Sequence, residues 1–345
     1  MTHLDSILLS ELAAASAEVD QQWTWPEQQL DRLAQAGELQ WVVPREYGGL
    51  DCDGPELIAR YREVAAACLT TAFILTQRNG AIQRIAASEN TDLKQELLPA
   101  LGRGETFATV GISHLTTSRQ HLGKPAVAAR STDRGYVLDG TIPWVTGAAF
   151  AQTIVTGATL DDGRQVLLAL EAQQPEVDIR PPVQMLSMTA SATTSVAINS
   201  VEVTHDQLLA GPCEQVMQQG QGGGTGSLVT SALAAGLCAR CLALLQEEAA
   251  RRPDLAATVH AFEHEYNWLD QQFQAAAPSA ATIRQLANSL AMRISQACLA
   301  VTKGAGFISG QPAERAVREA MFFLVWSCPQ PVVAAALEEL SCPHD

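Results

Sequence analysis

The chain has 345 residues, of which 47% are hydrophobic and 17% charged, a balance typical of a folded protein and not of a disordered one. This length is enough for two or three packed units with well-buried cores. The formal net charge of −15 argues against nucleic-acid binding through phosphate contacts and against attachment to an anionic membrane surface.

Residues 1–20 carry acidic side chains and show neither the basic region nor the cleavage pattern of a signal peptide. No uninterrupted apolar run reaches the roughly 18 residues that a membrane span requires. A cytoplasmic location is therefore expected. The 8 cysteines are scattered along the chain, which argues against a disulfide scaffold. Cys238 and Cys241 form a C-x-x-C pair inside a helical pattern, and we interpret the pair as helix packing.

Residues 1–107 are predicted to form an N-terminal helical domain. Apolar residues recur with helical spacing in residues 4–19 and 26–37, where Pro26 can start a helix and Gly37 can end one. Two further helical stretches are expected at 55–88 and 91–104.

Residues 108–212 are predicted to form a central β-domain. The residue pattern changes there to short runs rich in Val, Ile and Thr, separated by Gly, Asp and Pro. Residues 133–135 and 161–163 carry the Asp and Gly typical of hairpin turns. The expected strands lie within 106–113, 126–130, 135–140, 152–160, 165–171 and 193–203.

Residues 213–345 are predicted to form a C-terminal helical bundle. Residues 219–226, QGQGGGTG, are interpreted as a flexible joint. Several amphipathic helices then follow over short links, which is typical of an antiparallel bundle. These helices are expected at 227–252, 254–277, 279–304, 312–326 and 329–340. The predicted fold class is therefore α+β, in the order helices, β-domain, helices.

The most informative segment is 139–152, in which Pro143 and Gly147 bracket a short extended piece. Because side chains alternate along a strand, Trp144 and Thr146 are expected to share one face while Val145 points the other way. An indole beside a hydroxyl suits a planar conjugated ligand that needs an apolar wall and one hydrogen bond. The alternative is a tryptophan in the core of the β-domain beside a solvated threonine.

The element order and a series of local motifs resemble the acyl-CoA dehydrogenase superfamily along nearly the whole chain. Each motif is common by itself, but together they occur in the family's order and at plausible spacing. The segments that carry the resemblance are 41–50 (WVVPREYGGL), 94–99 (KQELLP) with Gly104 and Glu105, 136–140 (YVLDG), 144–146 (WVT), 187–211, 304–307 (GAGF) and 314–320 (ERAVREA).

This resemblance implies FAD bound between the β-domain and the bundle, in a homodimer or homotetramer. It implies that the chain is a FAD-dependent oxidoreductase that acts on the CH–CH group of an acyl-CoA or related small-molecule substrate. The cofactor-binding positions that it assigns are Ile112, Ser113, Ser118, Trp144, Val145, Thr146 and Arg252.

Trp144 would flank the isoalloxazine ring, and Thr146 would hydrogen-bond near its reactive nitrogen. Ile112 and Ser113 match the family strand at the pyrimidine edge. Arg252 matches an arginine that reaches the FAD pyrophosphate of a neighbouring subunit, a task that suits a guanidinium with two parallel donors. The alternative for Arg252 is a basic residue that offsets the dipole at a helix C-terminus.

The usual catalytic carboxylate of the family is missing. Removal of the α-proton of a thioester requires a base, and Ser327 and Gly226 occupy the two family base positions. Residues 113–121 stand where the family has its phosphate-binding loop but differ from it in sequence. Within them His114 and His121 are acid–base candidates or, alternatively, surface residues. Two alternatives remain open: a flavin-dependent monooxygenase with His114 as the acid–base group, and a family-derived binding subunit without catalysis.

Two further patterns are set aside. His260, Glu263 and His264 can share one helix face, but no third ligand with supporting spacing is evident, so a solvated face is expected and no metal site is predicted. The glycines at 222–224 lack both a P-loop ending and a preceding strand, which favours a hinge.

Overall fold

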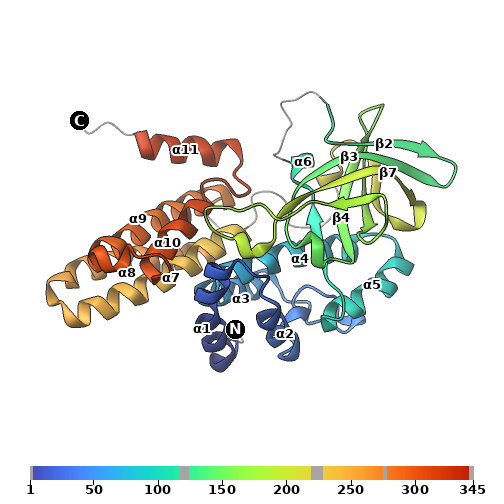
Figure 1. Cartoon of the computed structure of the whole chain (residues 1–345). Coiled ribbons are helices and arrows are strands. Elements are labelled where there is room, and N and C mark those ends of the chain that lie inside the picture. The colour runs from blue at the N-terminus through green and yellow to red at the C-terminus, as the bar shows by residue number, and fades with distance from the viewer. Residues whose placement is uncertain (1–2, 117–123, 219–227, 275–277, 342–345) are drawn as a thin grey trace.

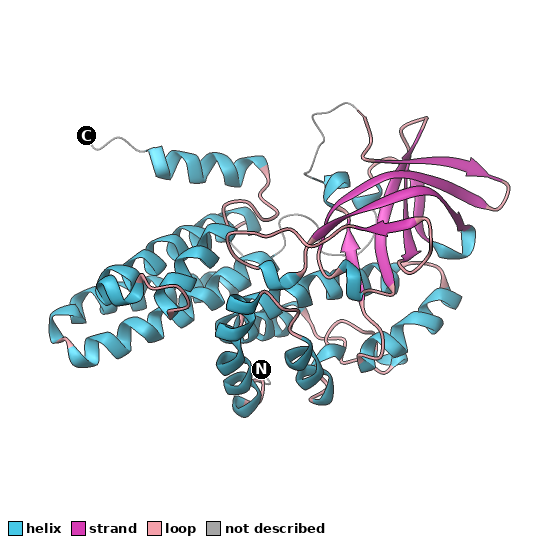
Figure 2. Cartoon of the chain, viewed as in Figure 1, coloured by secondary structure: helices cyan, strands magenta, loops and turns pink. Residues whose placement is uncertain are grey.

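The computed structural model describes residues 3–116, 124–218, 228–274 and 278–341. Its elements follow the predicted order of helices, sheet and helices, so the α+β class is confirmed (Figure 1, Figure 2). The expected joint at 219–226 lies outside the described residues. The domain boundaries expected after residues 107 and 212 stay predictions, although the first strand does begin at Ala108.

The N-terminal region contributes helices on the lower side of the sheet in Figure 1. Pro26 precedes the second of these helices, and Gly37 takes the left-handed conformation (φ 77°) shortly after its end, as the sequence predicts. The helices are α1 (Ser6–Gln22), α2 (Glu27–Gln35), α3 (Gly54–Ala67), α4 (Leu69–Ala87) and α5 (Thr91–Arg103).

The stretch expected as one helix over 55–88 is in fact two helices. Cys68 separates α3 from α4 with an extended backbone (φ −148°, ψ 106°). The change of direction allows α3 to pack on a C-terminal helix while α4 packs against the first strand of the sheet. Tertiary packing therefore overrides a continuous helical pattern at this residue.

Within the described residues the β-domain is one 8-stranded mixed sheet, in the order β6-β7-β3-β2-β4-β5-β8, with β1 paired to β4. β1 and β2 run parallel to successive parts of β4, and the other neighbours are antiparallel. The two predicted hairpin turns connect β2 to β3 and β4 to β5. The strands are β1 (Ala108–Gly111), β2 (Val127–Thr132), β3 (Gly135–Val145), β4 (Thr153–Leu160), β5 (Gln165–Glu171), β6 (Val177–Ile179), β7 (Thr194–Thr204) and β8 (Leu208–Cys213).

Two strands and one short helix were not predicted. β6 has only 3 residues, and β8 contains Gly211 and Pro212, which normally mark a turn. The helix α6 (Ser113–Thr116) follows β1 directly. All three elements form because of contacts with neighbouring segments, since their own residues show no clear strand or helix pattern.

The C-terminal helices extend away from the sheet, and α11 stands apart above the others in Figure 1. By length and hydropathy α7 is the one helix in the described ranges that could cross a membrane, but 67% of its apolar window is buried inside the protein. Such burial is typical of a central bundle helix. The helices are α7 (Leu228–Arg251), α8 (Ala256–Gln274), α9 (Ala280–Gly306), α10 (Pro312–Phe322) and α11 (Gln330–Ser341).

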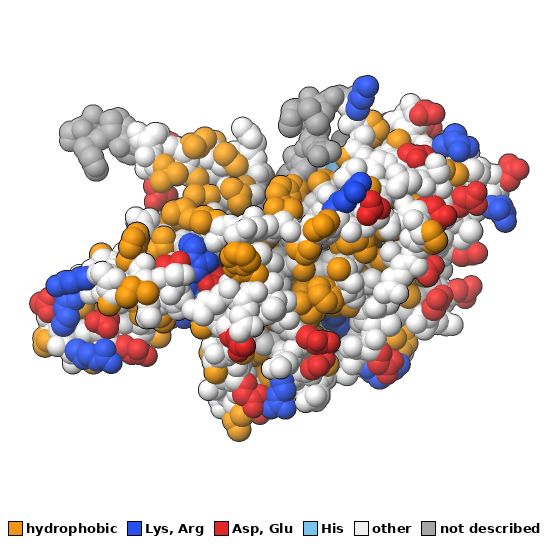
Figure 3. Space-filling view, viewed as in Figure 1, with side chains coloured by type: hydrophobic (Ala, Val, Ile, Leu, Met, Phe, Trp, Pro, Cys, Tyr) orange, Lys and Arg blue, Asp and Glu red, His pale blue; other side chains and the backbone are white. Residues whose placement is uncertain are grey.

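Two hydrophobic cores hold the molecule together. One joins the N-terminal helices, α7, α9 and α10 with part of β1, β5 and β8, and the other lies within the sheet. α3 and α7 meet at Gly236, where a Cβ would lie 2.6 Å from the backbone oxygen of Arg62. In Figure 3 charged side chains gather at the outer ends of bundle and sheet and over the lower helices, and hydrophobic ones are most frequent in the middle of the face.

A buried carboxylate links the helices of the larger core. Glu319 on α10 forms ion pairs with Arg240 on α7 and, at 3.9 Å, with Arg315, and its side chain is only 5% exposed. Replacement of Glu319 by Gln leaves two buried guanidinium groups without their acid, so we expect the free energy of unfolding to fall by about 3–5 kcal/mol. Urea denaturation measures this change.

The matched control is Glu105→Gln, which removes one partner of the exposed pair with Arg103. No measurable change is expected for this variant, because exposed pairs contribute little. Equal losses in the two variants would contradict the assignment of Glu319 as a structural anchor.

Candidate active site

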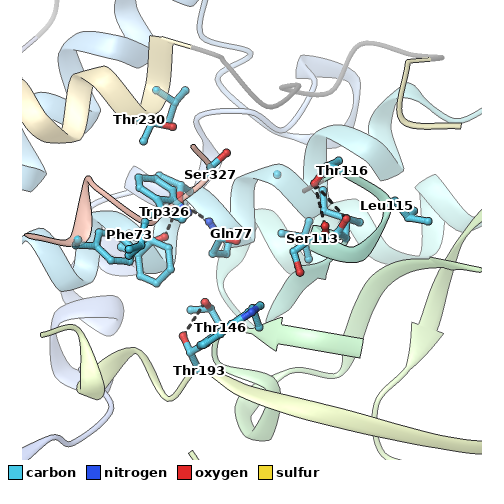
Figure 4. A pocket seen from close by; sticks show the side chains of 18 of the residues that line it. Phe73, Gln77, Ser113, Leu115, Thr116, Thr146, Thr193, Thr230, Trp326 and Ser327 are labelled. Carbon is cyan, nitrogen blue, oxygen red and sulfur yellow. Dashed lines mark hydrogen bonds between the residues drawn. The ribbon is translucent and has the colours of Figure 1, made fainter. Parts of the chain in front are cut away.

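A cavity of about 1560 Å³ lies between the sheet and the helices. Its walls come from all three regions of the chain: α4, then β1, α6 and β3, then the start of α7 and the segment after α10. Figure 4 shows Phe73 and Gln77 of α4 beside Trp326 and Ser327, with Thr146 and Thr193 across the space from them. The cavity therefore lies where the helical core meets the β-domain.

The end of β3 presents an aromatic ring to this cavity. Trp144 and Thr146 line it, whereas Val145 is fully buried in the sheet core. The strand is not regular here, since its pairing with β7 shifts between Ile142 and Val145 and Trp144 adopts a positive φ of 57°. A β-bulge thus aims the indole outward, and 56% of Trp144 is exposed. The alternative of a core tryptophan beside a solvated threonine is wrong, since Thr146 is only 1% exposed.

Hydroxyl groups form a chain behind Thr146. Its Oγ1 lies 2.9 Å from Oγ1 of Thr193 (Figure 4). Oγ1 of Thr193 in turn lies 2.8 Å from Oγ of Ser191. Thr109 donates to the backbone oxygen of Thr146 at 2.7 Å. These bonds fix the position of the Thr146 side chain at the cavity wall, because each hydroxyl both donates and accepts.

Ile112 and Ser113 lie on the neighbouring wall, at the junction of β1 and α6. Both line the cavity, and Oγ of Ser113 donates to the backbone oxygen of Pro143 at 3.2 Å. This bond ties α6 to the bulged end of β3. The structure therefore brings together four of the residues predicted for cofactor binding: Ile112, Ser113, Trp144 and Thr146.

His114 points away from the cavity, so its predicted acid–base role is not supported. Its Nε2 lies 2.9 Å from the carbonyl oxygen of Gly157 on β4, which assigns a proton to Nε2. Its Nδ1 is buried without a hydrogen-bond partner in the structure. Burial lowers the pKa of His114 below its ordinary value of 6.5, and the bond to Gly157 offsets part of that shift. The half-buried ring packs against β4 and is neutral at neutral pH.

Ser327 lies in the wall opposite the sheet, in the segment Trp326–Pro329 that follows α10. It has a positive φ of 47° and lines the cavity. The ring of Trp326 stacks on Phe322, with centroids 5.1 Å apart, and Phe73 packs against both edge-on. Arg284 of α9 donates to the backbone oxygen of Trp326 at 2.7 Å and so holds this segment in place.

Among the described residues that line the cavity there is no Asp, Glu, His, Lys or Cys. Tyr61 and Arg84 are the ionisable side chains there. Burial raises the pKa of Tyr61, so its hydroxyl stays protonated at neutral pH. The described walls thus contain hydroxyls, amides, aromatic rings and one guanidinium, and none of these groups is a base at neutral pH.

Not every predicted position lines the cavity: Val145 is buried in the core of the sheet. Ser118 and Gly226, like His121, are outside the described residues. Arg252 follows the end of α7 and does not line the cavity; it donates to the backbone oxygen of Val301 at 3.0 Å and pairs with Asp254 at 3.3 Å. Its predicted contact with a neighbouring subunit stays a prediction.

Sequence reasoning missed Arg84, Thr193 and the aromatic cluster of Phe73, Phe322 and Trp326. The sequence does carry a signal for Arg84, because an arginine in a mostly apolar helical stretch needs polar groups around its charge when it is buried. Thr193 and the aromatic cluster carry no such local signal, since they meet the site only through the fold.

No group of three or more potential metal ligands occurs within the parts of the chain that the structure describes. His260 and His264 are exposed on α8. The cysteines of the C-x-x-C pair are both buried and free on α7.

Comparison with known proteins gives consistent matches. Residues 3–105 match the family model "Acyl-CoA dehydrogenase, N-terminal domain". The probable acyl-CoA dehydrogenase YngJ of Bacillus subtilis is 23% identical over 340 residues, covering 90% of this chain and 88% of its own.

Solved structures share the fold over nearly the whole length. Butyryl-CoA dehydrogenase from Megasphaera elsdenii matches with a TM-score of 0.82 at 18% identity, covering 99% of both chains. The prolyl acyl carrier protein oxidase AnaB matches with a TM-score of 0.77 at 15% identity, covering 99% of this chain and 100% of its own.

The half-buried His114 makes the stability of the protein depend on pH in a way that can be measured. The folded state holds the ring neutral below its ordinary pKa of 6.5, whereas the unfolded chain protonates it there. The unfolded state then binds more protons, so the stability contributed by His114 is lost as the pH falls below about 6.5. We expect the free energy of unfolding to fall less steeply between pH 7.5 and 5 in His114→Gln than in the unaltered protein. An NMR titration in which His114 protonates above pH 6.5 would contradict this.

Proposed function

The chain belongs to the acyl-CoA dehydrogenase superfamily, and on that premise we propose that it is a FAD-dependent oxidoreductase. Its substrate is an acyl-CoA or a related acyl compound, oxidised at a CH–CH group. The observation that carries the proposal is the cavity itself, a space of about 1560 Å³ lined by the exposed ring of Trp144, by Thr146 and by Ser327.

The residues present suit a flavin ring. Trp144 offers an exposed aromatic face at the edge of the sheet, held by a bulge that also places Thr146 in the wall. The Thr146 hydroxyl can donate a hydrogen bond to a ligand when the Thr193 hydroxyl donates to Thr146 Oγ1. In that arrangement Thr193 accepts a hydrogen bond from the hydroxyl of Ser191. FAD, when bound, supplies a hydride acceptor. The chain's own part is to orient the reacting carbons and to keep water from them.

A second candidate function rests on the absence of a base from the described walls. Dehydrogenation beside a thioester carbonyl needs a group that takes the α-proton, and Ser327 offers a hydroxyl with no activating partner among the described residues. Flavin-dependent monooxygenation needs no such base. The burial of His114 removes it as the acid–base group of that reaction, so the cavity's amides and hydroxyls would do no more than position the substrate.

The similar structures give a precedent for other acyl substrates. AnaB is a prolyl acyl carrier protein oxidase, so its name describes an acyl group that is not carried by CoA. For this chain we therefore propose an acyl substrate, carried either by CoA or by an acyl carrier protein. We place the protein in the cytoplasm as a homodimer or homotetramer, with Arg252 of one subunit directed to the flavin of another.

Flavin binding is the first test of this proposal. The purified protein should be yellow, or become yellow on incubation with FAD. Trp144→Ala should weaken FAD binding by at least about tenfold, because it removes the aromatic face at the cavity. Quenching of flavin fluorescence on binding measures the affinity.

Trp23→Ala is the matched control, since Trp23 has the same backbone conformation (φ 56°) and a similar exposure of 52% but does not line the cavity. Its FAD affinity should be unchanged. A protein that stays colourless with both FAD and FMN would overturn both flavoenzyme proposals and leave the non-catalytic binding subunit.

Installing a carboxylate separates the two reactions. In Ser327→Glu the new side chain lies in the cavity wall at the family base position, and anaerobic bleaching of the flavin by an acyl-CoA should become at least about 100-fold faster. Ser327→Gln is the control, because it has nearly the same shape and the same backbone strain without a base. Rapid bleaching already in the unaltered protein would show that the base lies elsewhere, and oxygen-dependent turnover with reduced flavin would favour the monooxygenase.

A further inference from the structure

The hydroxyl chain behind Thr146 has a closed inner end. Ser191 is fully buried, and within the described part of the protein its Oγ has one hydrogen-bond partner, Oγ1 of Thr193 at 2.8 Å. Thr193 in turn contacts Thr146 at the cavity wall (Figure 4), whereas Ser191 does not line the cavity. A ligand can therefore interact with this chain of hydroxyls at its outer end and not at Ser191.

The number of protons gives the chain a direction. Three hydroxyls bring three protons, but the chain contains two contacts in which a proton is accepted. If both contacts pointed inward, the proton of Ser191 would have no acceptor in a place that water does not reach, and an unsatisfied buried donor is costly. One arrangement gives the protons of Ser191 and Thr193 an acceptor within the described residues: Ser191 donates to Thr193, and Thr193 donates to Thr146. The proton of Thr146 is then left for a group in the cavity.

The backbone holds the chain in this geometry. The amide of Gly147 donates to the backbone oxygen of Ser191 at 3.0 Å, and Oγ1 of Thr109 donates to the backbone oxygen of Thr146 at 2.7 Å. Thr146, Thr193 and Ser191 are all at most 4% exposed. These bonds join the end of β3 to the segment of Ser191, so the three hydroxyls keep their partners when a ligand enters.

A fixed donor distinguishes the two redox states of a flavin. The oxidised ring offers nitrogens that accept hydrogen bonds, and two-electron reduction by a hydride places the hydrogen on one of these nitrogens. That nitrogen changes from an acceptor to an N–H donor. A hydroxyl that could turn round would bind both states, but a hydroxyl held as a donor loses its hydrogen bond on reduction.

We infer that Ser191 and Thr193 are positioning residues that hold Thr146 as a donor toward the flavin nitrogen that receives the hydride. They thereby favour the oxidised flavin over the reduced one and lower the reduction potential of the bound cofactor. The inference rests on the proposed FAD-dependent function and adds how the protein sets the potential of that flavin.

The test measures the reduction potential of the FAD-loaded protein by reductive titration beside a reference dye. Thr193→Val removes the donor behind Thr146, so the preference for oxidised flavin should fall about tenfold and the potential should rise by about 30 mV, the equivalent of tenfold for two electrons. Thr193→Ser keeps the hydroxyl and should keep the potential. A potential that is unchanged or lower in Thr193→Val overturns the inference.

Thr194→Val is the matched control. Thr194 is the next residue, is equally buried at 2% and donates from Oγ1 to the backbone oxygen of Arg180 at 2.8 Å, outside the hydroxyl chain and the cavity. Its replacement removes a buried hydroxyl from the same strand and should leave the potential unchanged. An equal rise in Thr194→Val would show that any loss of packing there shifts the potential, and would overturn the inference.

Ser191 tests whether the hydroxyls act as a unit. Ser191→Ala should raise the potential in the same direction but by less, because Thr193 still donates to Thr146 and loses only the polarising effect of a third hydroxyl. In the Thr193→Val background the same change should add nothing. No shift in Ser191→Ala, or the same shift in both backgrounds, overturns the role of Ser191.

Two further results separate this inference from the proposal beneath it. Protein that binds no flavin overturns the oxidoreductase proposal and this inference together, whereas bound flavin with the same potential in Thr193→Val overturns the inference alone. If that variant does not fold, the unaltered protein decides with 5-deaza-FAD, in which a C–H group replaces the accepting nitrogen. The analogue should bind about tenfold more weakly than FAD, and equal affinity overturns the inference.

Discussion

The close packing of α3 against α7 is the constraint on which the rest of the structure depends. At Gly236 the two backbones approach so closely that any side chain would collide with Arg62 of α3. This contact merges the N-terminal and C-terminal helices into one hydrophobic core, although more than 120 residues of β-domain and connections lie between them in sequence. The sheet keeps a core of its own, so a seam remains where the two cores meet, and the cavity lies at that seam.

The walls of the cavity combine side chains of several kinds. Aliphatic residues such as Ile112, Leu115 and Met321 lie beside Gln, Ser, Thr and aromatic residues, and the ionisable side chains of the described lining are Tyr61 and Arg84. Such walls can hold and orient a ligand but cannot remove a proton at neutral pH. The chemistry of any reaction there therefore depends on what the bound molecules supply. Arg84 adds a positive charge to the wall, and it stays protonated at neutral pH and is not a base.

The left-handed backbone at Trp144 and Ser327 places strain on both sides of the cavity. A non-glycine residue in this conformation costs about 1–3 kcal/mol and persists only where the surroundings fix it. The hydroxyl chain of Thr146, Thr193 and Ser191 fixes one side. Arg284 fixes the other through the backbone oxygen of Trp326. Hydrogen bonds of buried polar groups thus hold the backbone near both residues, an arrangement that favours a preformed site over one that closes on its ligand.

The sequence by itself determined the order of the elements, because apolar periodicity, Pro26, Gly37 and the two Asp–Gly turns act through local backbone preferences. It also placed Trp144, Thr146, Ile112 and Ser113, whose motifs stand next to one another on the β-domain. The fold alone decided what depends on distant neighbours: the break at Cys68, the strand β8 through a Gly-Pro pair, the inward turn of His114 to Gly157, and the position of Arg84 in the cavity wall. Local patterns record how a segment bends, whereas the direction of a side chain is set by which segments pack around it.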